Sequence, residues 1–186
     1  MATRFRVGNG FDFHPLEAGR RLVLGGVEIK HDTGLRGHSD ADVAAHALAN
    51  AILGAIGAGD LGRHFPDNDP QYKNADSIAL LASVWKLASD QGWRLGNADL
   101  TIFAEKPKLK PHLDAMRARL AAVLNTDQSR MNVKASSPEG LGALAPAGPS
   151  LQRPRRLGAE TRRRPRFPCR RAELAIGAVI LKSGWW

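Results

Sequence analysis

The sequence contains a single cysteine and no long apolar segment. Cys169 has no second cysteine to pair with, so an intrachain disulfide is excluded and a reducing compartment is favoured. No apolar run reaches the length of a transmembrane helix. The residues from Met1 to Arg6 contain no apolar signal region. We therefore expect a cytoplasmic protein without a membrane partner, or a plastid protein if a transit peptide has been removed.

Acidic residues are scarce in the last quarter of the chain, and this scarcity accounts for most of its charge. The formal net charge of the 186 residues is +9. Residues 1–142 contain 17 Lys and Arg against 16 Asp and Glu, whereas residues 143–186 contain 10 against 2. A near-neutral body argues against a basic binding face on the folded domain, so we expect no specific nucleic-acid partner.

Apolar residues are numerous enough for one core, and their spacing alternates between strand and helix periods. Hydrophobic residues make up 43% of the chain, which is consistent with one domain. Strands are predicted over residues 5–13, over 21–29 as a hairpin turning at Gly25 and Gly26, over 98–103 and over 131–135. A polar loop is expected over residues 60–74.

Three segments have helical apolar spacing. The first follows a cap at Ser39 or Asp40 and ends near Gly57 or Gly59, the second runs from a cap at Asp76 to about Asp90, and the third opens at Pro111. Alternating strands and helices of this kind predict an α+β fold, an α/β-type sandwich in which helices pack on one face of a mixed β-sheet.

Asp12, His14 and His46 are the residues most suggestive of chemistry. Asp12 and His14 lie two apart on a predicted strand, so both side chains point to the same face, and a histidine in the following helix can face them. Two imidazoles and one carboxylate are a ligand set of catalytic zinc sites, which keep one position open. Each residue also has an ordinary interpretation, as a polar strand-end pair and as a histidine packed on a helix.

Further motifs follow in a fixed order along the chain. They are His38-Ser39-Asp40, the loop 59–70, the segment 104–108 and the segment 132–139. In this order and spacing, the chain from about Phe5 to Gly142 resembles the 2-C-methyl-D-erythritol 2,4-cyclodiphosphate synthases of the non-mevalonate isoprenoid pathway. The combination is highly specific, although no single motif is.

The resemblance implies a phosphorus–oxygen lyase. The family's substrate is 4-diphosphocytidyl-2-C-methyl-D-erythritol 2-phosphate, whose 2-phosphate attacks the β-phosphorus to give 2-C-methyl-D-erythritol 2,4-cyclodiphosphate and CMP. It implies Zn²⁺ on Asp12, His14 and His46, and Mg²⁺ or Mn²⁺ on Glu139. A phosphate nucleophile is already ionised at neutral pH, so the chemistry needs positioning and charge stabilisation rather than a strong general base.

The same resemblance implies roles for other residues. His38 and Ser137 are expected to be catalytic, with a helix cap as the alternative for His38 and Ser39. Substrate contacts are expected from Ser39, from Asp60, Gly62, Phe65, Pro66, Asp67, Asn68 and Asp69 around the methylerythritol end, and from Ala104, Lys106, Pro107, Lys108, Leu109, Ser136, Ser137 and Pro138 around cytidine. A plain turn is the alternative for Asn68 and Asp69. Asp42 either orients a metal ligand or is a solvated acid of the first helical turn.

Family members are homotrimers with active sites between subunits, so the same assembly is expected. After Gly142 the likeness stops, because the family continues with a glycine-rich turn and a last apolar strand. We interpret residues 1–142 as the synthase domain and residues 143–186 as a disordered Arg/Pro-rich tail. A reading-frame shift near Gly142 explains the break, and translating the other frames of the gene tests it. An exposed sheet edge and a weakened trimer follow, unless residues 174–181 serve as a substitute strand.

Three other interpretations remain open at this point. The chain is an impaired or inactive family member, or a zinc phosphohydrolase that releases inorganic phosphate, or a protein that binds polyanions or nucleic acid through the basic residues 153–171.

Overall fold

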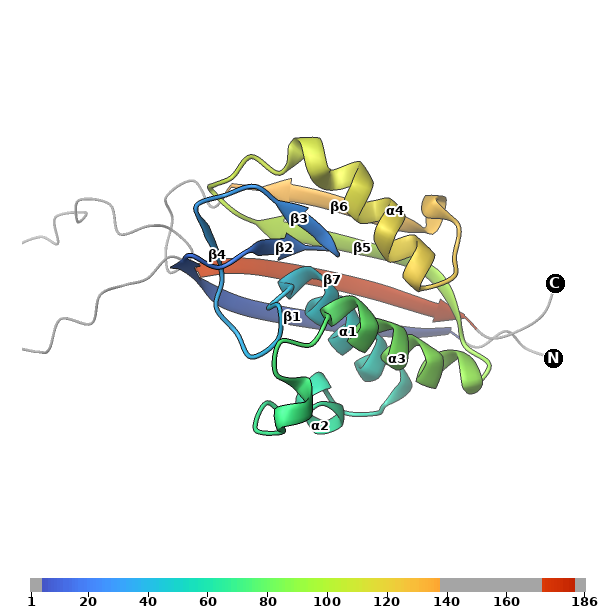
Figure 1. Cartoon of the computed structure of the whole chain (residues 1–186). Coiled ribbons are helices and arrows are strands. Elements are labelled where there is room, and N and C mark those ends of the chain that lie inside the picture. Colours follow the sequence, from blue (N-terminus) through green and yellow to red (C-terminus); the bar gives the residue numbers. More distant parts are fainter. Residues whose placement is uncertain (1–4, 138–171, 183–186) are drawn as a thin grey trace, which may run out of the picture.

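The computed structural model describes residues 5–137 and, as a strand, residues 172–182. Five strands form one sheet in the order β4-β1-β7-β5-β6 (Figure 1). Their bounds are β1 Phe5–Ala18, β4 Thr33–Leu35, β5 Arg94–Phe103, β6 Met131–Ser136 and β7 Ala172–Lys182. β5 and β6 are parallel and the other neighbours antiparallel, so the sheet is mixed.

Helices lie on one face of this sheet, as the apolar spacing predicts (Figure 1). The helices are α1 Val43–Ile56, α2 Leu61–His64, α3 Ser77–Asp90 and α4 Leu113–Val123, with 3-10 turns at Pro70–Tyr72, Lys110–His112 and Gln128–Arg130. α1 packs on β1 and β7, and α4 packs on β6. The expected α+β fold with helices on one face is confirmed. In the described part of the chain, no helix is long and apolar enough to cross a membrane.

The middle strand of the sheet comes from the end of the chain. β7 pairs with β1 from Phe5↔Lys182 to Pro15↔Ala172, and with β5 along its other edge. The expected disorder of residues 143–186 therefore does not hold for 172–182, which supply the substitute strand. The expected exposed edge is also wrong, because β7 closes the space between β1 and β5. The rest of the tail lies outside the described residues.

Two glycines of β1 bring α1 unusually close to the sheet. A Cβ atom at Gly8 would lie 1.8 Å from the backbone oxygen of Ala51, and one at Gly10 would lie 2.1 Å from that of Ala47. No side chain fits at either position, so the helix backbone rests directly on the strand. This contact sets the distance between β1 and the first turns of α1, where the candidate metal ligands meet.

A separate two-stranded sheet, the hairpin of β2 Leu22–Leu24 and β3 Val27–Ile29, turns at Gly25 and Gly26 as predicted. Both glycines have positive φ, 58° and 71°, which the tight hairpin turn requires. Asp42, the N-cap of α1, accepts the backbone N–H groups of Gly25, Gly26, Ala44 and Ala45 at 2.6–3.1 Å. One carboxylate thus ties the hairpin to the start of the helix.

Both interpretations of Asp42 from the sequence are wrong. The residue is fully buried and caps α1, whereas Ser39 or Asp40 was expected in that position. Burial raises the pKa of the Asp42 carboxyl to about 6, although the N–H groups of Gly26, Ala45 and Gly25 act in the opposite direction. Asp42 therefore joins two elements of the fold.

We expect Asp42→Ala to lower the free energy of unfolding by about 3 kcal/mol, because four backbone N–H groups lose their acceptor. The matched control is Asp76→Ala, which removes the cap of α3 and a single side-chain bond, to Ile78 N, at an expected cost of about 1 kcal/mol. Urea unfolding of both variants measures the difference. Equal losses would contradict the bridging role of Asp42.

Candidate metal centre and active site

Asp12 and His14 project from β1 toward the helix-covered face of the sheet. Gly8 and Gly10, in the same alternation, face α1 directly. The residues between them point the other way, and Phe11 and Phe13 are 46% and 53% exposed. The period of two thus gives β1 one face for packing and candidate ligands and one open apolar face.

His46 completes the cluster from the second turn of α1. Asp12, His14 and His46 each offer one ligand atom, and these three atoms all lie within 4.8 Å of one another. All three residues are half-buried. Asp12 Oδ2 lies 3.3 Å from His14 Nε2 and 3.1 Å from His46 Nδ1. The triad expected from the sequence is therefore assembled as predicted.

The charges in the cluster favour a cation between these groups. Burial raises the pKa of Asp12, but the hydrogen bonds and charges of His14 and His46 outweigh it and hold that pKa well below its usual range. The hydrogen bond with Asp12 raises the pKa of His14 above its usual value, against the opposing effect of burial. Asp12 is thus ionised, and its negative charge favours a cation at this position.

Hydrogen bonds fix which nitrogen of each imidazole faces Asp12. His14 Nδ1 lies 2.7 Å from the carbonyl oxygen of Arg36, which can only accept, so Nδ1 carries a proton and Nε2 is left for a ligand. Gly37 lies against this ring, since a Cβ there would be 2.9 Å from His14 Cε1. His46 Nε2 lies 2.8 Å from Ser77 Oγ and 3.3 Å from Ser39 Oγ, which leaves Nδ1 facing Asp12.

This donor set fits Zn²⁺. Two neutral imidazoles and one carboxylate are a known ligand set of open, catalytic zinc sites, and each histidine has a partner for its second nitrogen. Glu139, the expected ligand of the second cation, lies outside the described residues, as does Pro138. Ser39 is buried beside His46, and its hydroxyl accepts the N–H of Ala41, whereas His38 is exposed.

The loop expected to hold the methylerythritol end contains short helical turns. Asp60 caps α2 through the N–H of Arg63, and Asp69 caps the 3-10 turn through Gln71. The turn interpretation therefore applies to Asp69. Phe65 is half-buried and meets Tyr72 edge-on, with ring centroids 5.3 Å apart. Asp60, Asp67 and Asn68 are exposed, and Gly62 and the half-buried Pro66 complete the loop.

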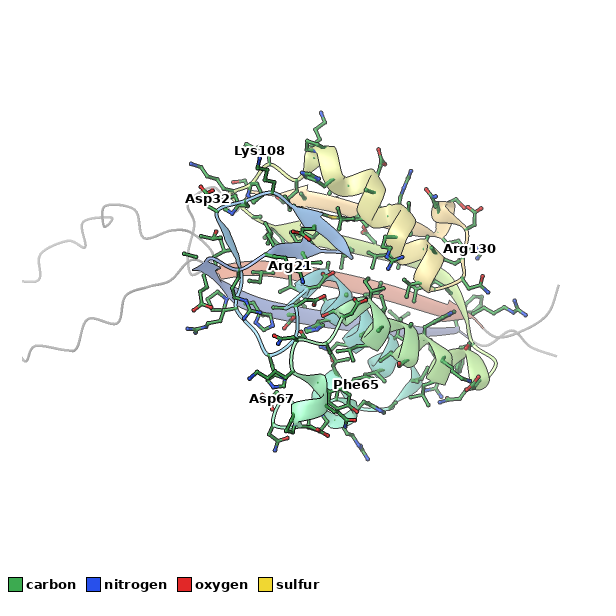
Figure 2. All side chains as sticks on the ribbon, viewed as in Figure 1. Arg21, Asp32, Phe65, Asp67, Lys108 and Arg130 are labelled. Atoms are coloured by element: carbon green, nitrogen blue, oxygen red, sulfur yellow. The ribbon has the colours of Figure 1, made fainter. Side chains whose placement is uncertain are left out.

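The residues expected to bind cytidine form a separate group. Ala104 N donates to Ser136 O at 3.1 Å, which joins the segment after β5 to the end of β6. Lys106, Lys108, Ser136 and Ser137 are exposed and Pro107 is half-buried, whereas the Leu109 side chain belongs to the core. Lys108 lies far from Phe65 and Asp67, at the opposite side of the molecule (Figure 2). Among the described residues of one chain, these two groups stay apart.

Sequence reasoning missed three residues around the metal centre. Asp40 and Ser77 hydrogen-bond to each other beside His46. Arg20 donates from Nη2 to Ser39 O at 3.1 Å, and its charge acts to lower the pKa of His14. A guanidinium so placed suits a phosphate group. Of these three residues, only Asp40 stood out in the sequence, within His38-Ser39-Asp40, and there it was interpreted as a helix cap.

Known proteins resemble this chain over most of its length. A profile of the YgbB family matches residues 5–147, ending close to Gly142, where the family's sequence pattern stops. A 2-C-methyl-D-erythritol 2,4-cyclodiphosphate synthase from Geobacillus kaustophilus is 59% identical over 138 residues, which are 74% of this chain and 87% of that protein.

Solved structures agree with this match. A 2C-methyl-D-erythritol-2,4-cyclodiphosphate synthase in its CDP-bound form has a TM-score of 0.76 and 32% identity, over 95% of this chain and 99% of that one. The bifunctional IspDF from Campylobacter jejuni has a TM-score of 0.81 and 36% identity over 100% of this chain, which spans 44% of that protein. Sequence and structure together show that this chain belongs to the YgbB family, among relatives named 2-C-methyl-D-erythritol 2,4-cyclodiphosphate synthase.

Proposed function

We propose that this protein converts 4-diphosphocytidyl-2-C-methyl-D-erythritol 2-phosphate to 2-C-methyl-D-erythritol 2,4-cyclodiphosphate with release of CMP. The observation that carries the proposal is the Asp12–His14–His46 cluster in a chain 59% identical to a synthase of that name. We assign Zn²⁺ to this cluster, and Mg²⁺ or Mn²⁺ to Glu139 together with substrate phosphates. When bound, these cations supply charge stabilisation for the transferred phosphorus.

The protein's own residues contribute orientation to this reaction. The nucleophile is an ionised phosphate, so the barrier depends on bringing two anions into line. Asp12, His14 and His46 would hold a cation whose charge attracts the diphosphate, and Ser39 lies beside His46 with the Arg20 guanidinium donating to its carbonyl oxygen. The exposed carboxylate of Asp67 suits the substrate's hydroxyl groups, and the half-buried Phe65 its carbon skeleton.

We propose a homotrimer whose active sites combine residues of two subunits. In the described part of the chain, Lys108 of the expected cytidine group lies far from Phe65 and Asp67 of the loop 60–69 (Figure 2). The open face of β1 presents Phe5, Val7, Phe11 and Phe13, which are 46–69% exposed. Adjacent apolar side chains of this size are typical of a surface that another subunit covers. The cytoplasmic location expected from the sequence stays a prediction.

The test is CMP release by the purified chain with the diphosphocytidyl substrate, Zn²⁺ and Mg²⁺. We expect CMP and the cyclic diphosphate in equal amounts, and no product after chelation until both cations are restored, because the reaction depends on their charge stabilisation. Light scattering on the same sample is expected to give the mass of three chains. Inorganic phosphate in place of CMP would support a zinc phosphohydrolase, and absence of both products would indicate an inactive family member.

A further inference from the structure

We propose that Asp40 and Ser77 are positioning residues that hold His46 ready to bind the metal through Nδ1. The proposal rests on the metal centre of the proposed function and extends it. Asp40 lies in the segment before α1, Ser77 is the first residue of α3, and His46 belongs to α1. Three separate segments of the chain are therefore linked in series, from Asp40 through Ser77 to the His46 imidazole.

The carboxylate of Asp40 determines the direction of the hydrogen bonds. Its Oδ1 accepts the Ser77 hydroxyl and the N–H of Asp42, and its Oδ2 accepts the N–H of Ser77 at 3.2 Å. An ionised carboxylate can only accept, so the single hydroxyl proton of Ser77 is committed to Asp40. Ser77 Oγ has only lone pairs left for its other neighbours.

The nearest of these neighbours is His46 Nε2, at 2.8 Å. Since Ser77 Oγ accepts, Nε2 carries a proton, and Nδ1 is the nitrogen left facing Asp12 Oδ2, 3.1 Å away, where a bound metal would take the place of the Nδ1–H···Oδ2 hydrogen bond. Metal-binding histidines generally donate their second N–H to an acceptor that fixes the ring and increases its basicity. Here Ser77 is that acceptor, and the Asp40 carboxylate fixes the direction of the hydrogen bond because it accepts the hydroxyl proton of Ser77.

Burial and distance favour Ser77 over the other hydroxyl nearby. Ser77 is 1% exposed, so water does not replace it as an acceptor. Ser39 Oγ is farther from His46 Nε2, at 3.3 Å, and already accepts the N–H of Ala41 at 3.0 Å. Ser39 is thus a weaker second acceptor, and removal of Ser77 leaves the imidazole less firmly held.

The test compares Zn²⁺ affinity of the full chain and its variants, by competition with a chromophoric chelator. We expect Ser77→Ala to weaken Zn²⁺ binding about tenfold or more, and Asp40→Asn to act in the same direction, since an amide cannot accept at both of its ends. The visible absorption bands of bound Co²⁺ are expected to shift in both variants. Asp76→Ala is the control, because it weakens the same end of α3 through Ile78 N without touching His46.

We expect Asp76→Ala to lower the thermal midpoint but to keep its Zn²⁺ affinity within about twofold of the unsubstituted chain. This change is much smaller than the loss of about tenfold expected for Ser77→Ala. Unchanged affinity and Co²⁺ spectrum in Ser77→Ala would overturn the positioning role, as would equal losses in Ser77→Ala and Asp76→Ala. An unsubstituted chain that binds no Zn²⁺ would instead overturn the metal centre itself, so the two failures are distinguishable.

Discussion

Replacing His46 by alanine is expected to lower the rate of CMP release by about a thousandfold. The substitution removes one of three ligands and leaves Asp12 and His14 to hold a cation alone. A loss of about 4 kcal/mol of charge stabilisation in the transition state corresponds to that factor. Steady-state assays with CMP as the readout, at saturating Zn²⁺ and Mg²⁺, measure the effect.

The matched control is His31→Ala, a histidine in the connection between β3 and β4 whose Nδ1 lies 2.9 Å from Thr33 O. It is expected to retain full activity. Zinc content and thermal midpoint, measured on both variants, separate loss of the metal from loss of the fold. Substantial CMP release by His46→Ala would show that the chemistry does not depend on the triad.

Gly10→Ala is expected to cost more than about 4 kcal/mol in the free energy of unfolding. Its Cβ would lie 2.1 Å from Ala47 O and 2.6 Å from Ala51 N, both backbone atoms of α1 that cannot rotate away. The helix must therefore move off the sheet, and costs of this size usually come from such overpacking. A protein of ordinary stability retains little margin after that loss. Soluble yield and urea unfolding measure it.

Gly54→Ala is the matched control for Gly10→Ala, and it is expected to change the stability in the opposite direction. Gly54 also lies in α1, but a Cβ there would meet only Asn9 O, at an ordinary 3.8 Å. We expect a gain of up to about 1 kcal/mol, because alanine is the better helix former. If Gly10→Ala unfolds at the same urea concentration as the original chain, the close approach of α1 to β1 is not required.

Local patterns in the sequence predict the metal ligands well. The alternation of β1 places Asp12 and His14 on one face, and the helical register of α1 places His46 against them. The cap at Asp76 and the glycine turn of the hairpin are likewise local features, and both are confirmed. Each depends on residues a few positions apart.

Contacts between distant segments could not be predicted in this way. Asp40 and Ser77 are 37 positions apart, and only the docking of α3 beside α1 brings them together. The sequence allows Asp42 to be a solvated acid, and only the position of the hairpin turn, whose Gly25 and Gly26 donate to its carboxylate, shows that it is buried. The apolar pattern of residues 174–181 suggested a strand, but not that it would lie in the middle of the sheet.

The central place of β7 has a consequence for how the protein is synthesised. A ribosome translates β1, β5 and β6 long before β7, yet Phe5 at the start of β1 pairs with Lys182 near the end of β7. Until then the nascent chain carries β1–β4 and β5–β6 as separate pairs, with unpaired apolar edges. Such edges are prone to aggregate, and pairing across the whole chain is slow. Folding of the sheet is therefore completed only once β7 has left the ribosome, and chaperones that shield nascent strands are expected to raise the yield of native protein.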